Sequence, residues 1–247
     1  MKMEIMGREG HSKSAIRPKV VVVDPTKTVL VIVDMQNEFV NPRGKIYTGP
    51  SASRSVARIS KLLNEARRLG MRVVHVMAVY DKGDPRFSEH PKAKFDKGGC
   101  LAGSWGAEIV PELAPLPSEP VVRKASYDCW FNTTMEDTLR KVGLGYDHDI
   151  SVHRNRAGND FSAVITGTVS NVCVEKAVIG FFLRGYQVIV PSDCISAKSR
   201  YAQEWALRQF TSLYRAKITS SRLLRIQGKE TNVVKSKPLR VIKSSTL

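Results

Sequence analysis

Continuous apolar runs alternate along this chain with stretches in which apolar residues recur every three or four positions. Residues 28–33 (TVLVIV) are apolar almost throughout, which is typical of a strand buried on both faces of a parallel sheet. Residues 53–69 carry apolar side chains at helical spacing, and Gly70 ends that pattern. By the same criteria we predict further strands at 71–79, 120–123, 162–166, 187–190 and 216–219, and helices at 105–113, 133–142, 172–184 and 202–213.

The alternation of strands and helices predicts the fold class. Repeated β-α-β units with short connections form a parallel sheet with helices on both faces. We therefore predict an α/β fold with a doubly wound, six-stranded parallel sheet in three layers, α/β/α. Residues 21–220 would form this domain, between a basic N-terminal extension (1–20) and a basic C-terminal tail (221–247) that could also reach over a neighbouring subunit.

Positive charge is concentrated at the two ends of the chain. The sequence has 39 Lys and Arg against 23 Asp and Glu, a net charge of +16. Residues 214–247 hold nine Lys and Arg and one Glu, and residues 1–19 hold five Lys and Arg and two Glu, so the body is only mildly basic. Basic ends bind polyanions nonspecifically through counterion release, but they more often serve solubility or oligomer contacts. We expect nucleic-acid binding to be at most nonspecific.

Hydropathy and cysteine spacing exclude several classes. The aliphatic runs fall short of the ~18 apolar residues that a membrane-spanning helix needs, and residues 1–20 contain no apolar segment typical of a secretory signal. The four cysteines, Cys100, Cys129, Cys173 and Cys194, lack the spacing of a zinc site. We expect reduced thiols in a cytoplasmic protein that needs no cofactor.

Three chemically distinct side chains follow three of the predicted strands, at the carboxyl edge of the sheet, where α/β folds bind their ligands. They are Asp34, Lys124 and Cys173. Taken singly, Asp34 could cap a turn, Lys124 could be solvated, and Cys173 could be a small buried hydrophobe. Together, an acid, a cation and a thiol are what a cysteine hydrolase needs.

The sequence segments around these three residues are similar to those of a known family. Four segments carry this similarity: VLVIVDMQNEF (29–39), GSWGAEIVPEL (103–113), RKASYDCWFNTTMEDTLR (123–140) and VITGTVSNVCVEKAVIGFFLRGYQVIVPSDCIS (164–196). They resemble segments of the isochorismatase-like cysteine hydrolase superfamily. That superfamily includes nicotinamidases, N-carbamoylsarcosine amidohydrolase and ureidoacrylate amidohydrolases. The resemblance extends from about residue 28 to residue 219, so it implies an isochorismatase-like fold for the whole central domain.

The resemblance implies that Asp34, Lys124 and Cys173 form a catalytic triad that cleaves a C–N bond through a covalent acyl-enzyme. The chemistry of the residues agrees, because a carboxylate can move the thiol proton, and a cation and a helix start both favour the thiolate. The resemblance also implies a cis peptide between Thr168 and Val169. The Val169 and Cys173 N–H groups would then form the oxyanion hole, in which each donor contributes ~2.7–4 kcal/mol.

Candidate substrate-binding residues surround the predicted triad in the sequence. Aromatic side chains could form an apolar wall around a small planar substrate, and an amide could orient it. A place in the core or at a subunit interface explains each of them equally well. These candidates are Phe39, Asn37, Trp105, Tyr127 and Trp130.

Differences from two branches of the superfamily narrow the range of possible substrates. Nicotinamidases resemble one another in a D-x-H metal site after the second strand, but here Arg86 stands two residues after Asp84, and His90 has no partner histidine nearby. We therefore predict no catalytic metal. Isochorismatases lack the nucleophilic cysteine, so the intact Cys173 favours C–N hydrolysis of a small amide, ureide or carbamoyl substrate.

Alternatives remain open at this point. The chain could be a nicotinamidase or an isochorismatase-type hydrolase, or a non-catalytic binding protein that uses its basic termini. Residues 145–161 exceed the short turn usual in the family, and we expect them to form a surface or oligomer-contact loop. We predict a homo-oligomer, a dimer or a tetramer, that does not bind membranes and acts on a small molecule.

Overall fold

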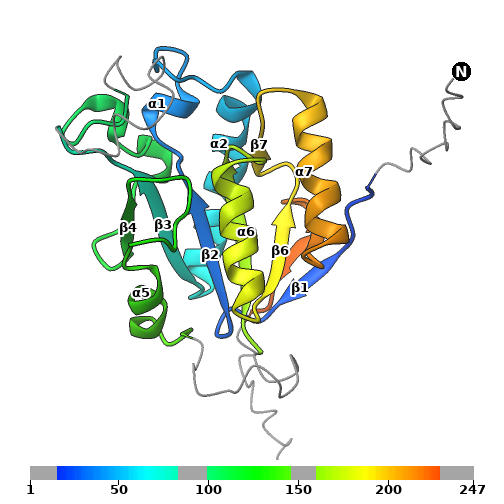
Figure 1. Ribbon diagram of the computed structural model, residues 1–247. Coiled ribbons are helices and arrows are strands. Elements are labelled where there is room, and N and C mark those ends of the chain that lie inside the picture. Colours follow the sequence, from blue (N-terminus) through cyan, green and yellow to red (C-terminus); the bar gives the residue numbers. More distant parts are fainter. Residues whose placement is uncertain (1–15, 83–98, 146–159, 229–247) are drawn as a thin grey trace, which may run out of the picture.

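A parallel sheet forms the centre of the fold. The computed structural model describes residues 16–82, 99–145 and 160–228 (Figure 1). The strands of the sheet lie in the order β4-β3-β2-β5-β6-β8, and a short seventh strand, β7, pairs with β5. All its pairings are parallel, so the predicted fold class is confirmed. The strands are β2 (Thr28–Val33), β3 (Arg72–Ala78), β4 (Val121–Lys124), β5 (Ser162–Thr168), β6 (Gln187–Pro191), β7 (Ile195–Ser196) and β8 (Lys217–Thr219).

Helices cover both faces of this sheet. Alternate residues of β2 point to opposite sides, so Val31 packs in one core cluster and Leu30 in the other. The cluster around Val31 contains side chains of α5, α6 and α7, whereas the cluster around Leu30 contains those of α2. Figure 1 shows the same layers, with α6 and α7 in front of the sheet and α2 behind it. The helices are α1 (Asn37–Val40), α2 (Pro50–Arg68), α5 (Met135–Lys141), α6 (Cys173–Leu183) and α7 (Arg200–Ser212).

The predicted helix at 105–113 is wrong. This segment forms two short 3-10 turns, η1 (Trp105–Ala107) and η2 (Pro111–Leu113). Pro111 lacks an N–H group and disfavours helical geometry in the residue before it, so a continuous helix cannot pass through this point. The segment instead pairs with the chain leaving β2: Asn37 donates its N–H to the Glu108 carbonyl, and Val110 donates to the Met35 carbonyl.

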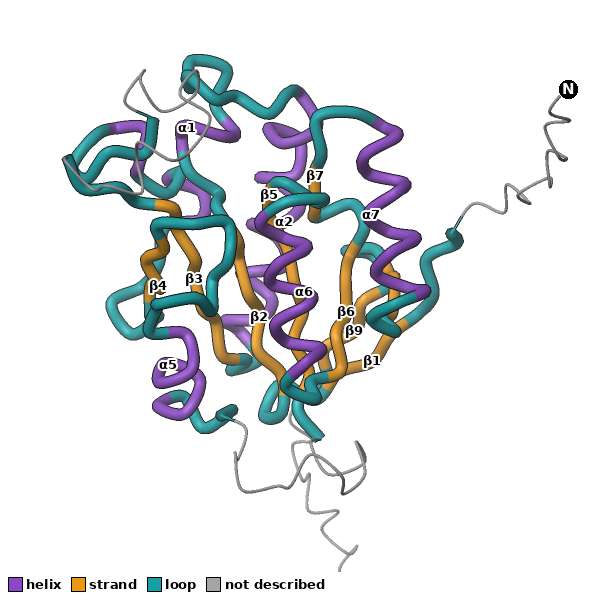
Figure 2. Tube along the Cα trace, in the orientation of Figure 1, coloured by secondary structure: helices purple, strands orange, loops and turns teal. Residues whose placement is uncertain are grey.

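A second, two-stranded sheet joins the beginning and the end of the described chain. β1 (Val21–Val23) pairs in parallel with β9 (Leu224–Ile226), and Figure 2 shows both strands beyond β6 at one side of the molecule. The backbone N–H of Lys19 also bonds the carbonyl of Ile218 in β8. β9 lies inside the segment 221–247 that the sequence assigns to a tail, so paired structure continues past residue 220.

Two segments with specific sequence predictions lie outside the described residues. Residues 83–98 contain Asp84, Arg86 and His90, and residues 146–159 make up most of the proposed surface loop. In the part of the chain that is described, no helix has the length and apolar character needed to cross a membrane.

Candidate active site

The three candidate catalytic residues lie at the carboxyl edge of the sheet. Asp34 directly follows β2, Lys124 is the last residue of β4, and Cys173 is the first residue of α6. β2 and β5 are neighbours in the sheet, and from this pair the chain builds outward in both directions. Asp34 and Cys173 therefore flank the topological switch point, where open α/β sheets bind their ligands.

Lys124 brings the other two residues together. Its Nζ lies 2.8 Å from Oδ2 of Asp34 and donates a hydrogen bond to Sγ of Cys173 over 3.4 Å. A third bond, of 3.0 Å, runs from the same amine to the carbonyl oxygen of Ser126. The side chains of both Asp34 and Lys124 are 1% exposed. The structure thus assembles the acid, the cation and the thiol that the sequence predicts at separate strand ends.

Burial and charge set the resting protonation of this cluster. Burial raises the pKa of the Cys173 thiol, Asp34 raises it further, and the lowering effect of Lys124 does not offset them. Burial alone would lower the pKa of Lys124, but Asp34 and Cys173 outweigh it and raise the pKa. Burial and Asp34 therefore oppose the thiolate, whereas Lys124 and the helix start favour it.

The backbone approaches itself closely beside the triad. Asp34 has a φ of 53°, and its N–H donates to the carbonyl of Val76. Across the pair β2 and β5, Gly167 has a φ of 117°, and a Cβ at this position would lie 2.0 Å from the carbonyl oxygen of Val33. Only glycine fits here, because both the conformation and the space exclude a side chain.

The turn that leads into Cys173 is held by buried hydroxyl groups. The peptide bond between Thr168 and Val169 is cis, as the resemblance implies. Ser196 donates from Oγ to Thr168 Oγ1 over 3.0 Å and accepts the Ser170 N–H at its carbonyl. The Ser170 hydroxyl donates to Gln203 Oε1 of α7 over 2.6 Å. The turn is therefore tied to both β7 and α7.

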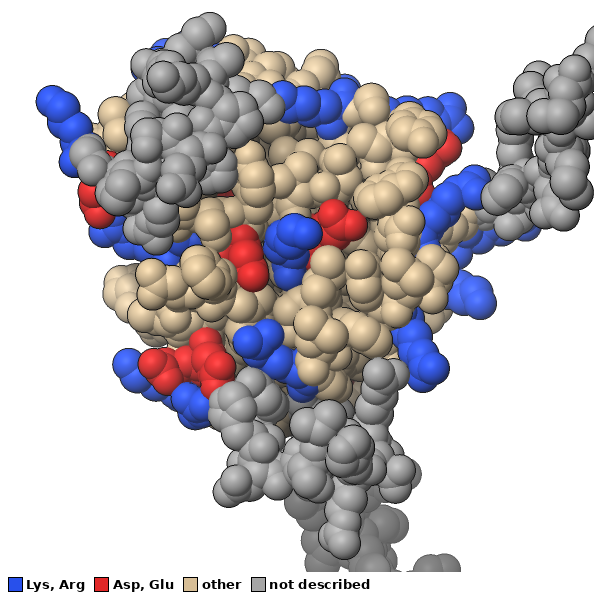
Figure 3. All heavy atoms as spheres, in the orientation of Figure 1, with Lys and Arg blue, Asp and Glu red and all other residues tan. Residues whose placement is uncertain are grey.

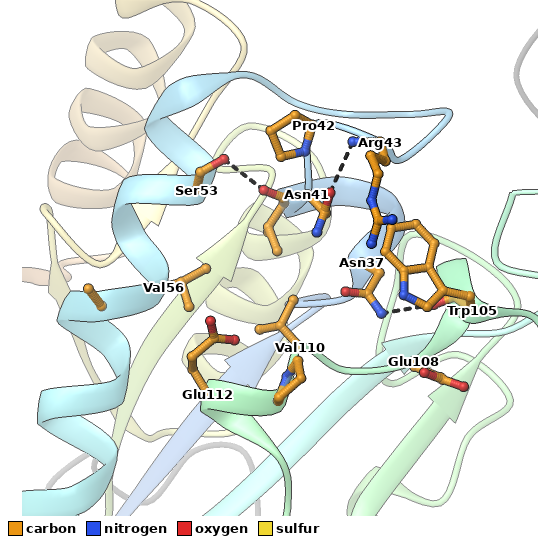
Figure 4. Close-up of a pocket in the computed structure, with 13 residues that line it drawn as sticks. Asn37, Asn41, Pro42, Arg43, Ser53, Val56, Trp105, Glu108, Val110 and Glu112 are labelled. Atoms are coloured by element: carbon orange, nitrogen blue, oxygen red, sulfur yellow. Dashed lines mark hydrogen bonds between the residues drawn. The ribbon is translucent and has the colours of Figure 1, made fainter.

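Two of the predicted substrate-binding residues line a cavity of about 590 Å³ (Figure 4). Asn37 donates from Nδ2 to the carbonyl of Trp105 over 3.0 Å, and the Arg43 guanidinium lies 4.8 Å from the Trp105 ring centre. The cavity lies between α1, α2 and the η1–η2 segment, and its lining does not include Asp34, Lys124 or Cys173. The structure thus places Asn37 and Trp105 together but in a cavity whose lining excludes the triad.

The other three candidates lie in different surroundings. Phe39 packs against a small cluster that includes Tyr80 and Cys100, while Tyr127 is 39% exposed. Trp130 packs edge-on against Phe181 of α6, with the two ring centres 4.8 Å apart.

Trp130 also covers the middle and the far end of α6. A Cβ at Gly180 would clash with its indole, and the Arg184 guanidinium lies 3.9 Å from the ring centre. Gly180 is about two helical turns from Cys173. Trp130 therefore packs on the helix at a distance from the thiol.

Sequence reasoning missed three buried residues beside the triad. Tyr80 and Cys100 are both within electrostatic reach of Asp34, Lys124 and Cys173, and burial is the main cause of the raised pKa of each. Gln36 is fully buried and bonds the end of β3. Gln36 lies in the polar run DMQNE (34–38) directly after β2, and this position at the end of a buried strand was the available signal for it.

The described residues form no cluster of typical metal ligands. Across residues 16–82, 99–145 and 160–228, no three His, Cys, Asp or Glu side chains gather in a group that could hold a metal ion. The stretch with Asp84 and His90 is outside these ranges, so the prediction of no catalytic metal stays a prediction.

Comparisons with known proteins identify relatives of this fold. Residues 28–222 match the model of the isochorismatase domain. An isochorismatase family protein from Desulfovibrio vulgaris is similar at 26% identity and a TM-score of 0.67, covering 79% of this chain and 95% of its own. N-carbamoylsarcosine amidase from Thermoplasma acidophilum has 25% identity and a TM-score of 0.62, with 79% and 96% covered. A nicotinamidase from Bacillus subtilis, at 19% identity and a TM-score of 0.65, shares the fold, with 78% and 100% covered.

Proposed function

The chain belongs to the isochorismatase family and is a hydrolase, and we propose that it uses Cys173 to cleave a C–N bond in a small amide, ureide or carbamoyl substrate. The observation that carries this proposal is the position of Lys124 Nζ, within bonding distance of both Asp34 and Cys173. A buried cation between a carboxyl group and a thiol suits nucleophilic catalysis better than packing, because burying charges without use is costly.

In the proposed first step, Asp34 takes the proton of the Cys173 thiol. The Asp34 carboxyl group is buried and interacts with the Cys173 thiol through a side-chain hydrogen bond, so it can accept this proton. The thiolate then attacks the substrate carbonyl carbon, forming a C–S bond while the carbonyl π electrons move to oxygen. When the carbonyl reforms, the C–N bond breaks and the amine leaves with the proton from Asp34.

In the second step, water hydrolyses the resulting thioester. Asp34 removes a proton from the water as the water oxygen bonds the acyl carbon, and the C–S bond then breaks. The proton returns to sulfur, so the enzyme regains the resting thiol. Lys124 keeps its charge throughout and stabilises the negative charge as it moves between the carboxyl group and the sulfur.

The backbone around Cys173 offers donors for the oxyanion. The carbonyl of Val169 accepts hydrogen bonds from the N–H groups of Val172 and Val174, so these two N–H groups are not available to an oxyanion. Within the described residues, the N–H groups of Val169 and Cys173 donate to no other backbone group outside regular helices and strands. We assign these two free N–H groups to the oxyanion hole, which acts through preorganised donors.

An ammonia-release screen tests this function. The full chain is incubated with ureides, carbamoyl amino acids, biuret, nicotinamide and other small amides, beside Cys173→Ala and Cys129→Ala. Cys129 is a second buried thiol whose pKa burial raises to about 12, so its variant controls for the loss of a buried sulfur. We expect turnover by the wild type and Cys129→Ala and none by Cys173→Ala. Turnover by a folded Cys173→Ala variant would overturn the mechanism.

The alternative of a non-catalytic binding protein that uses its basic termini stays open, because most residues of those termini lie outside the described ranges. Figure 3 shows Lys and Arg interspersed with Asp and Glu on the face that α6 crosses, with uncharged surface between them.

The homo-oligomeric state stays a prediction, and gel filtration with light scattering distinguishes a monomer from a dimer or tetramer.

A further inference from the structure

We propose that Gln36 is a positioning residue that sets the distance between Asp34 and Lys124 through the end of strand β3. This assignment rests on the proposed roles of Asp34 and Lys124 in catalysis. In the contacts that the structure shows, Gln36 bonds neither the Cys173 thiol nor the Lys124 amine. Its proposed role is therefore indirect.

The side chain of Gln36 replaces a missing rung of the sheet. β2 and β3 pair up to Val33 and Val76, and the N–H of Asp34 adds one more bond, to the carbonyl of Val76. At Asp34 the chain turns away from the strand with a positive φ. Beyond that point the amide of Gln36 continues the pairing: Nε2 donates to the Ala78 carbonyl over 2.8 Å, and Oε1 accepts the Ala78 N–H over 2.9 Å.

Ala78 connects this amide to the cation. In the register between β3 and β4, Ala78 lies opposite Lys124, and the next residue, Val79, donates its N–H to the Lys124 carbonyl. The end of β3 is thus bonded to Gln36 on one side and to Lys124 on the other. Because Gln36 is two residues from Asp34, these bonds fix the backbones from which the 2.8 Å ion pair is built.

A third bond joins the Gln36 side chain to η1. Nε2 of Gln36 also donates to the carbonyl of Ala107 in η1 over 2.8 Å. All three strong bonds of the amide therefore go to backbone groups of two separate elements. Gln36 is 0% exposed, so water cannot replace any of these bonds when the side chain is changed.

Simple packing does not require this arrangement. An apolar side chain of the same length would fill the space, but it would leave the N–H and carbonyl of Ala78 without partners. Ala78 is the residue of β3 that lies opposite Lys124. A displacement of the reacting groups by about 1 Å can lower a rate about 10²-fold, so the effect should appear in the chemistry as well as in stability.

The test compares Gln36→Met and Gln36→Glu with the wild type, using the substrate found in the ammonia-release screen. For Gln36→Met we expect kcat to fall at least ~10-fold and KM to change less than ~3-fold, because the reacting groups are misplaced after substrate binds. We also expect the pH midpoint of Cys173 alkylation by iodoacetamide to move, because Asp34 and Lys124 act on this thiol in opposite directions.

Glu119→Gln is the matched control for stability. Glu119 bonds His75 of β3 and Arg67 of α2, so the change weakens another anchor of the same strand. We expect a lower melting temperature with unchanged kcat and an unchanged alkylation midpoint. The proposal is overturned if folded Gln36→Met keeps kcat within ~3-fold of the wild type, if its alkylation midpoint does not move, or if Glu119→Gln loses as much rate.

Gln36→Glu decides the question if Gln36→Met does not fold. A carboxylate still accepts the Ala78 N–H but repels the two carbonyl groups, and its protonated form regains one donor. We expect its rate, relative to the wild type, to be higher at pH 6 than at pH 8; a ratio that does not change with pH overturns the proposal. If the wild type hydrolyses no amide, the proposed function fails, and the alkylation midpoint alone decides the role of Gln36.

Discussion

Lys124 donates a hydrogen bond to the sulfur of Cys173 over 3.4 Å, from the end of a β-strand to the start of a helix 49 residues later. The same amine lies 2.8 Å from the Asp34 carboxyl group. The thiol therefore has a positive and a negative neighbour whose effects on its pKa are opposite in sign. Removing each neighbour in turn should separate activation of the thiol from proton transfer.

Lys124→Met should slow alkylation of Cys173 at pH 7. Lys124 lowers the pKa of the thiol, so its loss raises that pKa further and reduces the thiolate fraction. Turnover should be lost as well. Peptide mass spectrometry after a timed iodoacetamide pulse measures the rate at Cys173, and the same pulse on the unfolded chains provides the control. Equal labelling rates in the folded proteins would exclude the proposed role of Lys124.

Asp34→Asn should change alkylation and turnover in opposite directions. The carboxyl group raises the pKa of Cys173, so its replacement lowers that pKa and speeds alkylation at pH 7. Turnover should nevertheless fall at least ~10²-fold, because the group that carries the proton is gone. A variant that alkylates faster and still turns over within tenfold of the wild type would show that another base acts here.

Stability should decrease in acid because of a cluster of charged groups between α2 and β3. Burial raises the pKa of Glu119, but bonds from Arg67 and Leu116 outweigh it and lower the pKa to about 2. Burial also lowers the pKa of His75 from 6.5. Both groups bind protons more readily in the unfolded chain, so their contribution is present at neutral pH and is lost as the pH falls.

Urea unfolding at several pH values measures this effect. The His75 contribution should begin to decline below pH 6.5, and the Glu119 contribution should be lost between about pH 4.5 and pH 2. Glu119→Gln should be less stable than the wild type at pH 7, and this difference should shrink below pH 4.5 and nearly vanish near pH 2. A constant difference in unfolding free energy across this range would contradict the assignment.

Gly167→Ala should prevent folding or destabilise the protein by several kcal/mol. The added Cβ would lie 2.0 Å from the carbonyl oxygen of Val33, between two central strands that cannot move apart cheaply. Gly143→Ala is the matched control, because Gly143 has a φ of 74° with open space around it. Its cost should be about 1–2 kcal/mol, from the backbone conformation alone. Similar melting temperatures for the two variants would refute this explanation.

The segment after residue 227 should be dispensable for catalysis. A chain that ends at Gln227 keeps β9 and the bond from the Gln227 N–H to the Val23 carbonyl. Its kcat per folded active site should equal that of the full chain, while polyanion binding should weaken and lose its salt dependence. A chain that ends at Ser221 loses β9 and should melt at a lower temperature. A folded Gln227 chain with reduced kcat would place the removed segment at an active site.

The sequence predicted the parallel sheet and the three strand-end residues because both depend on strong local signals. Runs such as 28–33 are apolar enough to identify buried strands, and the edge at which parallel strands end is common to all of them. The predicted helix at 105–113 is absent because Pro111 interrupts the segment, although its apolar spacing is helical. β1, β7 and β9 have two or three residues each, which is too short for a periodic pattern.

Other features of the site depend on tertiary contacts that a sequence does not display. Burial raises the pKa of the Cys173 thiol, and neither the nearby cation nor the helix start in the sequence indicates this effect. Asn37 and Trp105 share a cavity because α1 and η1 meet there. Gln36 bonds Ala78 and Ala107, both remote along the chain, so these two partners could be identified only in the folded structure.

The parallel pairing of β1 with β9 links the order of folding to the direction of synthesis. Val21 lies opposite Leu224, so this contact has the greatest sequence separation of any strand pairing in the described chain. Such contacts form late, because the entropy of closing a long loop is lost before the contact can compensate for it. On the ribosome, β1 therefore emerges first among the described strands and lacks its partner until β9 has been made, so its edge is open to intermolecular pairing until then.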